Sequence, residues 1–299
     1  VVELTRPGGL DSPGGSRAAV ADITGDGVPD LAAAAGPGGT PRVVVLDGAT
    51  WEVVFSADVF EPSFRGGVFL AAGDVDGDGA AELAVTPDQG GGPRVRLFRG
   101  RDFAVLADFL GIEDPGFRGG ARPAFGTFSG GRADLLVAAG FGGGPRVAGY
   151  AGSALAEGRA EKLFADFFVF EPALRNGAYL TAGDLDGDGT ADLIAGGGPG
   201  GAPRVLALSG RDLIDSFGAT RTELANFFAG DPSGRGGVRV AAKDLDRDAY
   251  ADLVTGAGDG SAPVVRRFAG ASVVGNPDPA PLGEQLAFAA GFTGGVFVG

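Results

Sequence analysis

The chain has 299 residues, of which 44% are apolar, 58 are glycine and 19 are proline, so it can bury a core built from many short strands and tight turns. It contains no cysteine and no histidine, which excludes disulfide frameworks, the usual zinc sites and catalysis by either residue. The formal net charge of −14 argues against nucleic acid or an anionic membrane as partner and suits hard cations.

An acidic segment recurs along the chain. It reads ADITGDGVPDLAAA from Ala21, GDVDGDGAAELAV from Gly73, GTFSGGRADLLVAA from Gly126, GDLDGDGTADLIAG from Gly183 and KDLDRDAYADLVTG from Lys243. The first loop positions are Asp22, Asp74, Thr127, Asp184 and Asp244, spaced by 52, 53, 57 and 60 residues. A period of this length indicates a stacked repeat architecture.

Each repeat carries the same features in the same order. Gly-Gly or Asn-Gly precedes an apolar strand and the acidic loop, and a second apolar run, a glycine-rich turn and two further apolar segments follow. Short apolar runs bounded by glycine and proline favour strands, and a four-stranded unit of this length is a propeller blade. We predict an all-β fold, a single β-propeller over 1–299 with about five four-stranded blades, and six or seven blades possible in a parent protein. The repeat units are predicted at about 14–65, 66–118, 119–175, 176–235 and 236–293.

Three further features concern the ends and the connections. Residues 1–13 and 294–299 are predicted to be partial repeats, because VVELTRPGG resembles a last strand and TGGVFVG a first strand. The segment SALAEGRAEKLFADFF from Ser153 has helical spacing and predicts a helical excursion at the outer rim. Arginines at the same phase are expected to pair or stack between blades; they are Arg42, Arg94, Arg146 and Arg204.

The acidic loop shares Asp-x-Asp-x-Asp-Gly with EF-hands, dockerin repeats and strand-borne propeller loops. An EF-hand needs a bidentate Glu at position 12 and flanking helices, but position 12 here is Ala33, Val85, Ala195 or Thr255 within a predicted strand. A further acid stands at position 9 instead. Side chains at positions 1, 3, 5 and 9 with the carbonyl at position 7 would supply the hard oxygen ligands that calcium prefers.

This acidic loop lies between a glycine-rich strand and a following apolar strand. With it, the chain resembles the FG-GAP repeat of integrin-alpha-type and related bacterial propellers over nearly its whole length. The resemblance implies a calcium ion in the hairpin loop between the first two strands of a blade, about four structural ions in all. By position, the implied ligands are Asp22, Thr24, Asp26, the Val28 carbonyl and Asp30; Asp74, Asp76, Asp78, the Ala80 carbonyl and Glu82; Asp184, Asp186, Asp188, the Thr190 carbonyl and Asp192; and Asp244, Asp246, Asp248, the Tyr250 carbonyl and Asp252.

Two repeats depart from the pattern. The third has Thr127, Ser129 and glycines where acids should stand and keeps only Asp134, so no ion is predicted there. The fifth has Arg247 and Ala249 where the other loops have glycine. An alanine at a turn position that requires positive φ costs about 1 kcal/mol, so the fifth site is expected to be the weakest.

The pattern predicts a secreted or cell-surface module that binds a protein or glycan on a propeller face or groove, adhesion-like and without catalysis. Nucleic acid is not expected as partner, and no apolar stretch reaches the roughly 18 residues of a membrane span. A lectin remains an alternative, in which Trp51, Tyr150 and Tyr179 would line open grooves. A calcium-dependent polysaccharide lyase is another and would need Lys162 or Lys243 as base, and a structural array segment is the third.

Overall fold

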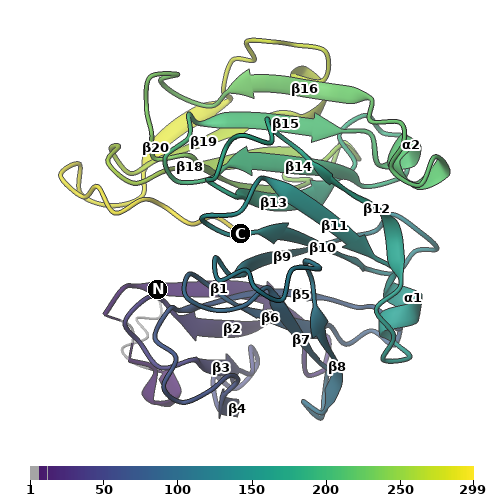
Figure 1. The fold of residues 1–299 in the computed structure, drawn as a ribbon, viewed down its shortest axis with the longest axis vertical. Coiled ribbons are helices and arrows are strands. Elements are labelled where there is room, and N and C mark those ends of the chain that lie inside the picture. The colour runs from purple at the N-terminus through teal and green to yellow at the C-terminus, as the bar shows by residue number, and fades with distance from the viewer. Residues whose placement is uncertain (1–6, 12) are drawn as a thin grey trace.

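The computed structural model describes residues 7–11 and 13–299, and in them it contains five four-stranded antiparallel sheets arranged as the blades of a β-propeller (Figure 1). The all-β prediction and the prediction of five blades are therefore confirmed. Each sheet is built from consecutive strands, so every blade is a local meander. In the described part of the chain no helix is long and apolar enough to cross a membrane.

Every blade has the same order from the axis outward. The innermost strands are β1 (Ser16–Ala21), β5 (Val68–Gly73), β9 (Ala121–Gly126), β13 (Ala178–Gly183) and β17 (Val238–Lys243). The second strands are β2 (Asp30–Ala35), β6 (Glu82–Pro87), β10 (Asp134–Ala139), β14 (Asp192–Gly197) and β18 (Asp252–Ala257). The third strands are β3 (Arg42–Leu46), β7 (Arg94–Phe98), β11 (Arg146–Tyr150), β15 (Arg204–Leu208) and β19 (Val264–Phe268). The outer strands are β4 (Val53–Asp58), β8 (Val105–Leu110), β12 (Lys162–Phe168), β16 (Glu223–Phe228) and β20 (Gly283–Leu286).

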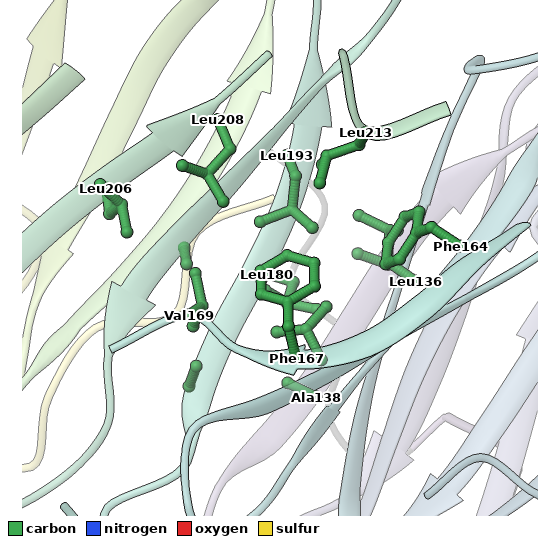
Figure 2. Close-up of a cluster of buried hydrophobic side chains, with 14 of the residues drawn as sticks. Leu136, Ala138, Phe164, Phe167, Val169, Leu180, Leu193, Leu206, Leu208 and Leu213 are labelled. Carbon is green, nitrogen blue, oxygen red and sulfur yellow. The ribbon is translucent and has the colours of Figure 1, made fainter. Parts of the chain in front are cut away.

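The core lies between adjacent blades, because each sheet is apolar on both faces. Second strands such as β14 are buried along their whole length. Between the third and fourth blades, Phe164, Leu193 and Leu213 are fully buried in one cluster, which Figure 2 shows with Leu136 and Leu206 around it. A single blade could not cover these side chains alone, so neighbouring blades stabilise one another.

Short helices account for the uneven repeat spacing. In the last three blades the connection from the third to the outer strand carries α1 (Gly152–Leu155), α2 (Gly210–Asp215) and α3 (Gly270–Val273). The helix predicted from Ser153 is thus only α1. Residues 156–161 form a turn and a short connection, and residues 162–168 form β12, whose Phe164 and Phe167 pack into the core. Helices α2 and α3 were not predicted. The added residues fall at the rim, where the spacing widens to 57 and 60 residues.

The C-terminal segment 293–299 occupies a sixth inner-strand position. At each junction the N–H of a turn glycine donates to the carbonyl of the residue before the next Gly-Gly or Asn-Gly pair. Gly38 donates to Arg65 in this way (2.7 Å), and Gly260 donates to Thr293 (2.8 Å). Val296 N–H then donates to the Ala257 carbonyl at 2.9 Å. In Figure 1 the C-terminus accordingly lies near the middle of the molecule.

The opening segment, for which the sequence predicts a partial strand, is described only from Pro7 onward. Its described part begins with a 3-10 turn, η1 (Pro7–Gly9), which lies against β3 and β4. Leu10 follows and packs into a small cluster with Val44 and Leu46. Residues 1–6, on which most of that prediction falls, lie outside the described residues.

Candidate metal centre

The acidic loops join the first and second strands of each blade, so they all lie on one rim of the propeller. Each blade from the second to the fifth is bonded to the loop before it: Ala81 N–H donates to the Asp22 carbonyl (2.7 Å) and Ala251 N–H to the Asp184 carbonyl (2.7 Å). Equivalent bonds join Ala133 to Asp74 and Ala191 to Thr127. Backbone hydrogen bonds therefore link the loops in series from the first blade to the fifth. A loop held in its folded conformation supports the blade that follows it.

Within a loop, the carboxylate at position 1 organises the turn. In the second blade Asp74 accepts hydrogen bonds from the backbone N–H of Gly77 (2.6 Å) and Gly79 (2.9 Å). Both glycines have positive φ, 78° and 88°, a conformation that glycine adopts without strain. Asp78 in turn accepts from Ala80 N–H at 2.8 Å. Glycine at these two positions thus lets the side chains of three acids converge without backbone strain.

Carboxylates converge in three of the loops. Oxygen atoms from three acids lie within 4.8 Å of one another in the groups Asp74, Asp76, Asp78; Asp184, Asp186, Asp192; and Asp244, Asp246, Asp248. In the fourth blade Arg211 pairs with Asp188 at 2.5 Å, which draws that acid from the group. Carboxylate oxygens gathered in this way fit a calcium ion.

The first loop has two acids and Thr24 at positions 1, 3 and 5. Asp22 accepts from the N–H of Gly25 and Gly27, as Asp74 does in the second blade. The Thr24 hydroxyl is buried and has no hydrogen-bond partner among the described residues. A buried hydroxyl usually has one, and an oxygen ligand to a cation is a consistent role for it.

The position 7 residues lie at the end of each loop, two residues before the position 9 acid; they are Val28, Ala80, Thr190 and Tyr250. Ala80 is buried and Val28 is exposed. The Tyr250 ring packs against Gly187 of the preceding loop, where an added Cβ would lie 2.6 Å from the ring. This position therefore also contributes to stacking of one loop on the next.

The position 9 acid has a structural role that the sequence analysis missed. Glu82 is 1% exposed and accepts hydrogen bonds from Val75 N–H (2.8 Å) in the acidic loop and Gly100 N–H (3.1 Å) in the next rim turn. Asp30, Asp192 and Asp252 bridge the same two turns in their blades. The sequence feature that could have revealed this role is Asp134, the one acid that the loop of the third repeat keeps. It makes the equivalent bonds to Phe128 and Gly152 without an acidic loop around it.

Burial and mutual repulsion raise the pKa values of several loop acids. Burial raises the pKa of Asp192 to about 7, and the nearby Asp186 and Asp184 add to the effect. Burial, with repulsion from neighbouring acids, also raises the pKa of Asp186 and of Asp246. The Arg211 guanidinium lowers the pKa of Asp188. A divalent cation would relieve this repulsion.

Without calcium, we expect the unfolding free energy to fall as pH rises from 5 to 8. The folded-state pKa of Asp192, about 7, exceeds its ordinary 3.8, so its contribution is full below about 3.8 and is lost through 7. Urea denaturation in EDTA at four pH values measures this as a falling midpoint, and Asp192→Asn should remove most of the slope. A midpoint that is flat or rises over this range contradicts the assignment.

Comparisons with known proteins agree with this geometry. A family model described as an FG-GAP-like repeat matches residues 22–85, which span the first two acidic loops. The protein is a β-propeller whose first two repeats match the FG-GAP-like model. The chain matches no curated protein by sequence.

Solved structures share the propeller fold of this chain at low sequence identity. The structure of U3-55K has a TM-score of 0.53 and 14% identity and covers 92% of this chain and 68% of its own. A Bacteroides caccae protein of unknown function has a TM-score of 0.51 and 11% identity and covers 86% and 73%. An Agrocybe aegerita lectin specific for non-reducing terminal N-acetylglucosamine has a TM-score of 0.49 and 17% identity and covers 94% and 68%. The first two likenesses show the fold alone.

The face opposite the acidic loops carries repeated grooves between blades. One groove, of about 420 Å³, is lined by Phe170, Glu171, Arg204 and Phe228 among others. A second, of about 350 Å³, has Phe60, Glu61, Arg94 and Leu110 at the equivalent positions. The phased arginines pair chiefly within their own blade, as Arg42 does with Asp58 at 2.8 Å. Arg94 and Arg204 also reach Glu61 (3.6 Å) and Glu171 (2.9 Å) of the neighbouring blade.

The aromatic residues proposed for such grooves lie elsewhere. Tyr150 is 2% exposed and donates a hydrogen bond to the Gly111 carbonyl at 2.9 Å. Tyr179 lines the central channel. Trp51 is exposed in the turn before β4. None of the three lines the two grooves described above, where the aromatic side chains are phenylalanines.

Replacing the two strained residues of the fifth loop is expected to stabilise the propeller. Arg247 and Ala249 have φ of 68° and 73°, where the fourth loop has Gly187 and Gly189. Each change to glycine should add about 1 kcal/mol to the unfolding free energy, since a side chain disfavours this conformation. Chemical denaturation measures the gain, with Gly189→Ala as the matched variant that should lose about the same. A loss on introducing glycine contradicts the expectation.

Proposed function

We propose that this protein is a calcium-binding β-propeller that serves, secreted or at the cell surface, as a binding module without catalysis of its own. The observation that carries the proposal is the convergence of three carboxylates in each of three rim loops. The buried, unpartnered Thr24 hydroxyl in the first loop supports a fourth site. Loops of this kind suit the millimolar calcium found outside cells, for which a dissociation constant of roughly 10⁻⁴ to 10⁻³ M suffices.

The ions would be held by the loop acids at positions 1, 3 and 5, with Thr24 at position 3 of the first loop and Asp192 at position 9 replacing Asp188 in the fourth. The position 9 acids already accept backbone hydrogen bonds from two turns, so they would set the loop's shape and neutralise charge as much as bind. Bound calcium would supply the positive charge that lets the acids stay ionised close together. The first four loops each bond to the next blade, so ion binding in one loop would also stiffen its neighbour.

The ligand would bind on the opposite face. The rim with the acidic loops is occupied by its own hydrogen bonds, whereas the grooves between blades are open and combine an aromatic wall with an Arg and Glu pair. Concave sites with a few oriented polar groups are the usual form of a ligand site. A protein segment or a glycan would fit this chemistry.

Equilibrium dialysis with calcium tests the first part of the proposal. We expect three to four ions per chain, and one fewer after Asp74→Asn with Asp76→Asn, a pair that changes only the second loop. Arg42→Gln, at the start of the third strand of the first blade, serves as control and should keep the full count. A count of zero or one would overturn the calcium proposal.

A lectin is the second candidate, because the grooves repeat at equivalent positions as carbohydrate subsites would. A glycan array with the wild type and with Glu171→Gln tests it, and binding that Glu171→Gln abolishes would support it. Binding of a protein partner with no glycan binding would favour the protein ligand instead.

A lyase is less well supported. Lys162 pairs with Asp166 at 2.8 Å and donates to the Tyr150 hydroxyl. Burial opposes its charge, but these partners raise the Lys162 pKa overall, whereas a catalytic base needs a lowered one. Lys243 lies exposed at the end of β17.

A further inference from the structure

The central channel is lined by a ring in which arginines and aromatic residues alternate. The second residue of each inner strand points to it, and Phe297 of the C-terminal segment supplies the sixth member. In ring order the members are Arg17, Phe69, Arg122, Tyr179, Arg239 and Phe297. Because the members come from different blades, no local stretch of sequence reveals the ring.

Each guanidinium lies over aromatic rings on both sides. The Cζ atom of Arg17 is 3.7 Å from the Phe69 centroid, that of Arg122 is 3.9 Å from Tyr179, and that of Arg239 is 4.8 Å from Phe297. The Cζ atom of each arginine also lies 5.1 to 5.7 Å from the centroid of the aromatic ring on its other side, so the contacts run around the whole ring. Stacked in this way, a guanidinium is held by its faces and keeps its N–H edge for hydrogen bonds.

The positive charges exceed their carboxylate partners. Arg17 pairs with Asp88 at 2.5 Å and Arg239 with Asp259 at 2.7 Å. Arg122 is 4% exposed, donates to the Ala178 carbonyl at 2.9 Å and has no carboxylate partner in residues 7–11 and 13–299. The Nε atoms of all three arginines are buried and lack any hydrogen-bond partner within the same residues. The channel thus holds one more arginine than carboxylate partners. A buried charge without a counterion is costly, so a bound anion would be stabilising here.

A hollow of about 300 Å³ opens onto these side chains. It is lined by the three arginines, Asp88 and Asp259, together with glycine-rich turns from all five blades. It therefore lies on the axis, at the face opposite the acidic loops. The positive charge is locally in excess here although the whole chain has a net charge of −14.

We propose that this channel mouth binds one oxyanion group, a carboxylate or a sulfate, with Arg122 as the principal contact between Arg17 and Arg239. A guanidinium edge matches the planar oxygens of such a group. The inference goes beyond the proposed function, because it depends on the channel and not on the acidic loops.

Isothermal titration calorimetry in calcium buffer tests the site, with sodium malonate and sodium sulfate titrated separately at constant ionic strength. We expect saturable binding of one anion per chain, and the stronger of the two identifies the preferred group. An absence of saturable binding with both anions would overturn the proposal.

Three variants make the test specific. Arg122→Gln should weaken binding by about 10-fold or more, as for loss of a charged hydrogen bond. Asp88→Asn should tighten it several-fold, because it frees Arg17 from a competing carboxylate, and a purely structural role would not produce that gain. Arg42→Gln, on β3 and outside the channel lining, should leave affinity unchanged. Should Arg122→Gln fail to fold, the Asp88→Asn result decides, and unchanged or weaker binding there overturns the proposal.

Discussion

Removal of calcium is expected to lower the melting temperature by about 10 °C or more. At a calcium concentration 100 times the dissociation constant, each site contributes about 2.7 kcal/mol. Three or four such sites amount to roughly 8 to 11 kcal/mol, and for a chain of this length 1 kcal/mol corresponds to about 1 to 2 °C. Calorimetric melts in 10 mM calcium and in EDTA measure the difference.

Two controls separate specific ions from general ionic effects. Magnesium at the same concentration should restore little of the stability, because it prefers fewer protein ligands and retains its water. Asp74→Asn with Asp76→Asn should reduce the calcium-dependent shift by about a third while leaving the EDTA melt unchanged or slightly higher, since it removes repulsion. Equal melting temperatures in calcium and EDTA would contradict structural calcium.

Features that recur at the same position of each repeat could be predicted from the sequence. The spacing of Asp22, Asp74 and Asp184 predicts the blades, and the positive φ of Ala249 follows from the glycines that occupy its place in other loops. These features are local, so one repeat explains another. The sequence does not reveal α2, because its residues lie in a rim connection that differs in length between blades.

Features that depend on the order of blades could not be predicted. Tyr179 has the phase of Phe69 and Arg122, but only the closed ring places these residues side by side. Tyr179 was therefore considered for an outer groove. The role of the position 9 acid was missed for a related reason, since its second partner, Gly100 for Glu82, lies in a different turn of the blade.

Asp134→Ala is expected to lower the unfolding free energy by about 3 to 5 kcal/mol, equally with and without calcium. The Asp134 carboxylate is 1% exposed and accepts from the backbone N–H of Phe128 (3.1 Å), Ser129 (2.9 Å) and Gly152 (2.8 Å). Alanine would leave these donors without an acceptor, and each unsatisfied buried group costs about 1 to 3 kcal/mol. Urea denaturation in calcium and in EDTA measures the loss.

The third blade isolates the structural role of this acid because its loop has no other carboxylate. Asp192→Ala in the fourth blade should lose more in calcium than in EDTA, since it removes both a clamp between turns and part of a carboxylate group. Ser129→Ala, which removes only the hydroxyl bonded to Asp134, should cost about 1 kcal/mol or less. If Asp134→Ala costs under about 1 kcal/mol, or its cost appears only in calcium, position 9 acts through the ion and does not clamp the turns by itself.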